Sequence, residues 1–180
     1  MCVYLCVANR RQSPERPLQK GYFSKSDSFA FKALDLGQKI HYKKGVADAA
    51  NNIGINYYYQ DNYAKSLHQY FNAYKIADSI GYKKGMATAL MGIGEVYQDE
   101  GDDSSTLKED RKSYKLYRDI GYELGMADVL IDMGWSFNNL EKDSAAFEKG
   151  EQALQLYEKV GNKGGVAAAL DLMGKVYEDR

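Results

Sequence analysis

The residues best suited to chemistry are few and lie far apart in the sequence. Among 180 residues there are two histidines, His41 and His68, and two cysteines, Cys2 and Cys6. Two thiols cannot complete a zinc site alone, and no histidine is near them in the sequence. His41 is expected in a turn and His68 on the outer part of a helix, with no nucleophile beside either. We therefore expect surface histidines and no metal site.

Motifs for phosphate binding or acid–base catalysis are equally weak. Residues 92–94, Gly-Ile-Gly, form a fragment of a dinucleotide fingerprint, but they are expected inside a helix, where close packing explains them. The carboxylate pairs Asp102, Asp103 and Glu109, Asp110 could exchange protons, yet turns and solvated helix faces explain them better. The sequence therefore predicts no catalytic residues, no cofactor and no enzyme activity.

Composition restricts the class of protein further. Net charge is −1, with 27% charged and 44% apolar residues, which fits a folded chain without an electrostatic surface for nucleic acid or an anionic membrane. The apolar run at residues 2–8 is too short to span a membrane, and no basic region precedes it. Because the cysteines form no disulfide framework, a reducing, cytoplasmic compartment is expected.

The dominant signal is a repeat with a period of 40 residues. The glycines at 45, 85, 125 and 165 fall in register, as do those at 54, 94, 134 and 174. A fixed period in this range indicates a solenoid, in which each unit buries its faces against its neighbours. The four copies read HYKKGVADAANNIGINY from 41, GYKKGMATALMGIGEVY from 81, GYELGMADVLIDMGWSF from 121 and GNKGGVAAALDLMGKVY from 161.

Each unit is predicted to hold two helices, called A and B. Helix A covers the repeated stretch, and helix B follows it with apolar residues at helical spacing and ends near Gly81, Gly121 or Gly161. Both prolines, Pro14 and Pro17, lie before residue 18 and mark a leader or linker. The predicted divisions are a leader at 1–20, a lone helix B at 21–40, full units at 41–80, 81–120 and 121–160, and a terminal helix A at 161–180.

A glycine inside helix A costs about 1 kcal/mol relative to alanine, so its repetition needs a physical reason. We expect helix B, or the next helix A, to cross closely at Gly54, Gly94, Gly134 and Gly174. This spacing therefore predicts tight contacts between neighbouring helices.

The units resemble the tetratricopeptide repeat (TPR) family. The resemblance rests on Leu90, Ile93-Gly94, Tyr97 and Gly101-Asp102, and it covers about residues 21–180. The usual period of the family is 34, and this sequence looks like its 40-residue variety, found in bacterial signalling proteins and in Leu-Gly-Asn-type scaffolds. The resemblance implies an all-α fold, a right-handed α-solenoid of about eight helices in antiparallel pairs.

The resemblance also implies that helices A line a concave groove that binds proteins or peptides. Trp135 is assigned to the groove in preference to the core, because its counterparts Ile55, Glu95 and Lys175 are chemically mixed. For Tyr58 and Tyr59, groove and core remain equal alternatives. The groove-facing residues expected from the resemblance are Asp48, Asn51, Ile55, Tyr58, Tyr59, Met91, Glu95, Gln98, Asp128, Ile131, Asp132, Trp135 and Asn138.

The chemistry of this groove favours a basic or mixed apolar segment. TPR proteins that clamp a terminal carboxylate use lysine and asparagine side chains, whereas the matching positions here carry Asn51, Ile55, Gly92, Asp128 and Asp132. Two aspartates would repel a carboxylate. The predicted partner is thus a basic or mixed apolar protein or peptide segment.

Two departures from the family pattern carry expectations of their own. In the helix B of unit 81–120, Thr106, Asp110 and Ser113 replace small or aromatic residues, and an unpaired aspartate on a packed face is costly. We expect this helix to be the loosest internal one.

The repeat also ends on a helix A without a polar capping helix, which predicts either a longer protein or self-association through the array ends.

We conclude from the sequence that the chain is a non-catalytic scaffold or adaptor that binds a protein or peptide segment. The alternative is a regulatory or sensory segment of a larger signalling protein, such as a histidine kinase, a nucleotide cyclase or a transcription regulator.

Overall fold

The computed structural model describes the backbone of residues 20–178 and the side chains of residues 28–178. The predicted leader lies outside these residues except for Lys20, as do Cys2 and Cys6. The described chain consists of helices and turns, so the all-α prediction with about eight helices is confirmed. The helices are α1 Lys20–Lys39, α2 Lys43–Tyr59, α3 Tyr63–Asp78, α4 Lys83–Asp99, α5 Asp103–Asp119, α6 Glu123–Asn139, α7 Asp143–Lys159 and α8 Lys163–Glu178.

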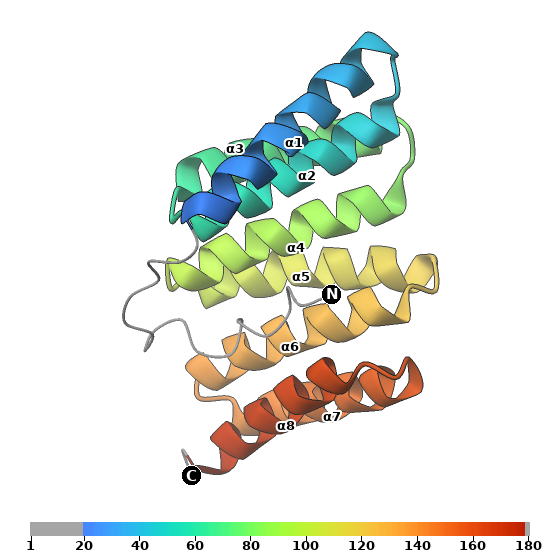
Figure 1. The fold of residues 1–180 in the computed structure, drawn as a ribbon. Helices are drawn as coiled ribbons and strands as arrows, with labels where there is room; N and C mark the ends of the chain where they lie inside the picture. The colour runs from blue at the N-terminus through green and yellow to red at the C-terminus, as the bar shows by residue number, and fades with distance from the viewer. Residues whose placement is uncertain (1–19, 179–180) are drawn as a thin grey trace.

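The helices stack as sequential antiparallel pairs in two layers. Each helix packs against the next one in the chain, and α2, α4, α6 and α8 also contact one another in that order. The odd-numbered helices of the described chain make no such contacts among themselves. Figure 1 shows α4, α6 and α8 in one layer, with α5 and α7 behind them. Because the even-numbered helices approach one another more closely, they form the inner layer of the array.

The turns between helices share one backbone geometry. A residue with positive φ follows the end of each helix from α1 to α7, and three of these residues, His41, Asp61 and Glu141, are not glycine. The next residue donates its N–H to the carbonyl five positions earlier, at 2.8 to 2.9 Å. This is the left-handed helix end expected at the glycines, and it satisfies carbonyls that the helix leaves open. The left-handed positions are His41, Asp61, Gly81, Gly101, Gly121, Glu141 and Gly161.

Three of the four repeated glycines of the inner layer lie at close crossings, as the spacing predicts, whereas the prediction is wrong for Gly174 on α8, where a Cβ would meet no atom within 4 Å. A Cβ on Gly54 would lie 2.7 Å from the ring of Tyr70 on α3. A Cβ on Gly94 would lie 2.6 Å from a carboxylate oxygen of Asp110 on α5. At Gly134 the obstacle is a Leu side chain of α8, so the crossing helix is the next helix A.

The apolar core is a series of clusters placed along the array. One joins α6, α7 and α8, a second joins α4, α5 and α6, and two more join α2, α3 and α4. In such a core each unit is stabilised by its contacts with the adjacent units. Among the described residues, no helix has the length and apolar character needed to cross a membrane.

Candidate functional site

The residues predicted to face a groove all lie on α2, α4 and α6, in the inner layer. Most of their side chains are partly exposed and can therefore reach a molecule lying along this layer. Those partly exposed are Asp48, Ile55, Tyr59, Met91, Glu95, Gln98, Asp128, Trp135 and Asn138. The structure thus brings these side chains onto one layer of helices.

Four predicted groove residues are buried, which corrects the expectation that they are open to a partner. The Asn51 side chain donates to the backbone carbonyl of Gly85 at 3.1 Å and ties α2 to α4. Tyr58 lies in a core cluster shared by α2, α3 and α4, and Ile131 lies in the core shared by α6, α7 and α8. The fourth, Asp132, is also buried. Helix periodicity places these residues on the correct helices but cannot show how closely the next helix covers them.

Two further predicted groove residues make structural hydrogen bonds. Gln98 Nε2 donates to the backbone carbonyl of Asp132 at 3.2 Å and to Ser136 Oγ at 3.1 Å, which ties α4 to α6. The Tyr157 hydroxyl donates to Asp128 Oδ1 at 2.8 Å, which ties α7 to α6. These side chains therefore stabilise the array as well as lining its inner layer.

Trp135 combines features of core and surface. Its ring packs against the cluster of α6, α7 and α8, yet the residue is partly exposed. The indole Nε1 is buried and has no hydrogen-bond partner. A buried donor without an acceptor is costly, so this N–H lowers the stability of the array.

The interpretation of residues 102–103 and 109–110 as turn and solvated carboxylates is wrong for Asp103 and Asp110, whereas the comparison with the family pattern correctly placed Asp110 on a packed face. Asp103 is buried and accepts a hydrogen bond from Asn139 Nδ2 at 2.9 Å. Asp110 is 0% exposed, and neither of its carboxylate oxygens has a hydrogen-bond partner. The repeat register contained the signal, because the matching positions of α3 and α7 hold Tyr70 and Gly150, which are also buried.

Acidic side chains gather around Asp110, and we call Glu95, Asp110, Asp128 and Asp132 the central carboxylates. Burial raises the pKa of Asp110 well above its usual value, and repulsion from Glu95 and Glu109 adds to this shift. Burial also raises the pKa of Asp132, with further repulsion from Asp110, Glu95 and Asp128.

Asp128 differs from Asp110 in having a hydrogen-bond donor. Burial raises the pKa of Asp128 to about 6, and the hydrogen bond from Tyr157 acts in the opposite direction. Within the part of the chain that the structure describes, no set of three or more His, Cys, Asp or Glu side chains is arranged to hold a metal ion. The central carboxylates thus form an acidic centre whose arrangement does not suit a metal.

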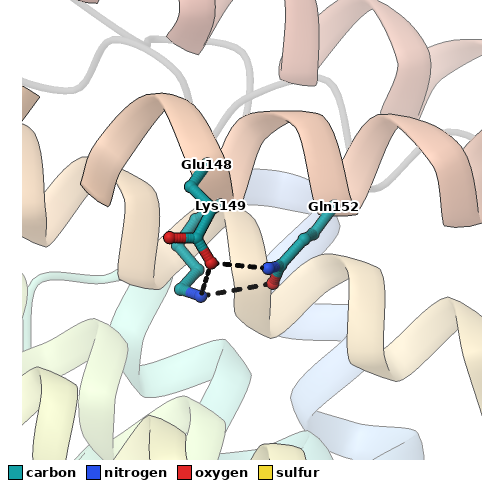
Figure 2. A network of polar contacts seen from close by, with 3 residues as sticks. All are labelled: Glu148, Lys149 and Gln152. Carbon is teal, nitrogen blue, oxygen red and sulfur yellow. Dashed lines mark hydrogen bonds and ion pairs between the residues drawn. The ribbon is translucent and has the colours of Figure 1, made fainter. Parts of the chain in front are cut away.

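A polar network on α7 contrasts with Asp110, because its carboxylate has hydrogen-bond donors and a cation beside it. Lys149 Nζ donates to Glu148 at 3.1 Å and to Gln152 at 3.2 Å, and the Gln152 amide donates to Glu148 at 2.8 Å (Figure 2). Here a cation neutralises the carboxylate, and amide and carboxylate satisfy each other. Asp110 has neither form of compensation.

The helix pairs and their stacking define the fold as a TPR-like helical repeat array. It is similar to the crystal structure of BtubC (BKLC) from P. vanneervenii, with a TM-score of 0.73 and 16% identity over 89% of this chain and 67% of that one. It is also similar to a Podosopora anserina protein, provisionally described as a kinesin light chain with nearly identical TPR-like repeats. That match has a TM-score of 0.65 and 9% identity over 89% of this chain and 80% of that one. No protein-family model matches the sequence, and no curated protein matches it.

Proposed function

We propose that the chain is a non-catalytic scaffold or adaptor that binds a protein or peptide segment along its inner layer. The observation that supports this most is the set of partly exposed side chains that α2, α4 and α6 present together. TPR-like arrays commonly bind proteins, and the repeated helices here supply the same kind of extended surface.

The inner layer favours a basic or mixed apolar segment. Glu95 and Asp128 supply negative charge, while Ile55, Met91 and Trp135 supply apolar and aromatic surface. A lysine or arginine side chain is attracted by the first group, and an apolar side chain packs on the second.

The test is a selection of peptides from a random library against the whole chain, followed by affinity measurements with two variants. Glu95→Lys reverses a charge on the inner layer, and Glu151→Lys makes the same change on an exposed position of α7 in the outer layer. We expect the selected peptides to bind Glu95→Lys at least about tenfold more weakly than the parent. Binding to Glu151→Lys should match the parent.

Selected peptides that bind both variants as well as they bind the parent would place the binding surface elsewhere. Helical circular dichroism of both variants shows whether either change disturbs the fold. Trp135→Phe is a useful third variant, because it keeps an aromatic ring and removes the unsatisfied indole N–H.

The face of α8 supports a second, coarser proposal. Leu170 and Tyr177 are 53% and 60% exposed, and a Cβ on Gly174 would meet no atom within 4 Å. At the glycines of α2, α4 and α6 that match Gly174, a Cβ would lie within 2.7 Å of a side chain from another helix. This face therefore suits a helix from a neighbouring region, as in a regulatory segment of a larger signalling protein, or from a second copy of the chain.

A further inference from the structure

The junctions between units differ at one pair of repeat positions. Between α3 and α4, the ring of Tyr70 occupies the space beside Gly92, so that even a Cβ there would collide with it. Between α7 and α8, a Cβ on Gly150 would lie 2.7 Å from the Met173 side chain and 3.6 Å from that of Leu172. In both junctions a glycine faces large side chains that are apolar where they meet it.

The middle junction, between α5 and α6, holds two aspartates at this pair of positions. Asp110 stands where Tyr70 and Gly150 stand, and Asp132 stands where Gly92 and Leu172 stand. Both aspartates are buried, and they are close enough to repel each other. The pair thus replaces an apolar contact with two acidic groups at the centre of the array.

The described chain supplies no positive charge to this pair. The charged groups that act on Asp110 are Glu95 from α4, Glu109 from its own helix and Asp132 from α6. Those that act on Asp132 include Asp128, one turn earlier on α6. No ion pair joins Asp110 or Asp132 to a lysine or arginine of the described chain. A buried carboxylate without a cation or a donor is strongly unfavourable.

We propose that the central carboxylates receive one lysine or arginine side chain of the partner segment. This inference rests on the proposed function, since the cation belongs to the bound segment. Glu95 and Asp128 are partly exposed on the inner layer and form the entrance, while Asp132 and Asp110 lie deeper. A lysine or arginine side chain suits carboxylates placed at these different depths. Its aliphatic part can pack on apolar surface while its terminal charge approaches the carboxylates.

Binding of a cation here has a measurable consequence. Among residues 28–178 no basic side chain is paired with Asp110 or Asp132, so within this part of the chain a proton is what neutralises the pair. An arriving guanidinium or ammonium group favours the ionised carboxylates, so the proton leaves to solvent as the cation binds. Binding is therefore coupled to proton release.

The experiment uses a blocked tetra-arginine peptide and its neutral counterpart, tetra-citrulline, with the full chain at about neutral pH. Calorimetry in two buffers of different ionisation enthalpy gives the number of protons released. We expect tetra-arginine to bind with release of about one proton, and tetra-citrulline not to bind. Asp110→Asn and Asp132→Asn should each weaken tetra-arginine binding at least about tenfold and abolish the release.

Asp171→Asn is the matched control, because it removes one exposed aspartate of α8, which is not one of the central carboxylates. It should leave affinity and proton release unchanged. Binding without proton release, equal binding by the two Asn variants, or no binding of tetra-arginine would each overturn the inference. If the peptide library instead selects segments without lysine or arginine, the proposed function stands and this inference falls.

Discussion

Asp110 gives a pH dependence whose sign follows from its burial. The pKa of this carboxyl is raised in the folded state, so the folded chain holds the proton more tightly than the unfolded chain. The free energy of unfolding that this group contributes is therefore greatest below the usual aspartate pKa. This contribution falls as pH rises toward the raised pKa of the folded state.

The substitution Asp110→Asn removes this ionisation. We expect the variant to gain stability relative to the parent as pH rises from about 5 to about 8, by an amount on the order of 1 kcal/mol or more. Urea unfolding at several pH values measures this difference. A stability difference that stays constant with pH would mean that Asp110 does not titrate in this range.

The two glycines at matching positions of α2 and α8 give a second prediction. A Cβ on Gly54 would meet the buried ring of Tyr70 at 2.7 Å, whereas a Cβ on Gly174 would meet nothing within 4 Å. We expect Gly54→Ala to destabilise the chain by about 1–3 kcal/mol through overpacking. Gly174→Ala should stabilise it by up to about 1 kcal/mol through helix propensity. Thermal and urea unfolding of the two variants and the parent measure these changes. Equal changes in stability for Gly54→Ala and Gly174→Ala would contradict the prediction.

Among single residues, sequence patterns predicted some roles and missed others. The close crossings at Gly54 and Gly94 followed from repetition of an otherwise costly residue. The burial of Asn51 and the carbonyl it binds did not follow, because that contact joins α2 to α4 and depends on their separation. The pairing of Asp110 with Asp132 likewise becomes apparent only when two helices are placed side by side.

At the scale of helices, the α5–α6 junction can be converted to the type found between α3 and α4. The double variant Asp110→Tyr with Asp132→Gly copies the Tyr70 and Gly92 pair. We expect the double variant to be more stable than the sum of the two single-variant effects implies. The favourable coupling should be about 1–3 kcal/mol. A double-mutant cycle by urea unfolding measures this coupling. Additive effects would mean that the two positions do not face each other as inferred.

The helix α5 provides a test of local stability. Thr106 and Ser113 donate hydrogen bonds to carbonyls of α4, at 3.1 and 2.8 Å, which supports the helix. Asp110, between them, is buried without such a partner. We expect the amides of α5 to exchange with solvent faster than those of α3 and α7, because local opening exposes the carboxylate to water. Hydrogen exchange that finds α5 the best protected of the three would contradict this expectation.

The pairing of helices was predictable because a repeated pattern averages out local exceptions. One copy of residues 41–57 could be interpreted in several ways, but four copies in register leave a single periodic arrangement. The polar character of α5 was visible in Thr106 and Ser113, yet their bonds to α4 carbonyls were not, since hydroxyl groups have many acceptors within reach.

At the scale of the whole molecule, the two ends of the array are complementary. On α8, Leu170 is exposed where its counterparts on α2, α4 and α6 are buried, and on α1, Ala33 is exposed where its counterparts on α3, α5 and α7 are buried. An α8 of one copy can therefore pack on α1 of another as α2 packs on α3. This contact is heterologous and would extend from copy to copy.

We expect the chain to associate as its concentration rises, and Leu170→Glu or Ala33→Glu to reduce that association by about tenfold or more. Sedimentation velocity over a concentration series measures it. The substitution Lys115→Glu on the exposed side of α5 serves as the control for introducing a glutamate. A parent chain that remains monomeric at all concentrations would show that these ends do not pair.

The spacing of the residues with positive φ has a consequence for how repeat units can be duplicated or lost. They recur every twenty positions from His41 to Gly161, always with the same backbone geometry. Cutting the chain at two such turns forty residues apart and rejoining it recreates a turn that the protein already has. Duplication or loss of a gene segment encoding one unit would therefore yield a chain that needs no new turn and no new kind of helix contact. The length of this protein can thus change by inheritance in whole units while its architecture stays the same.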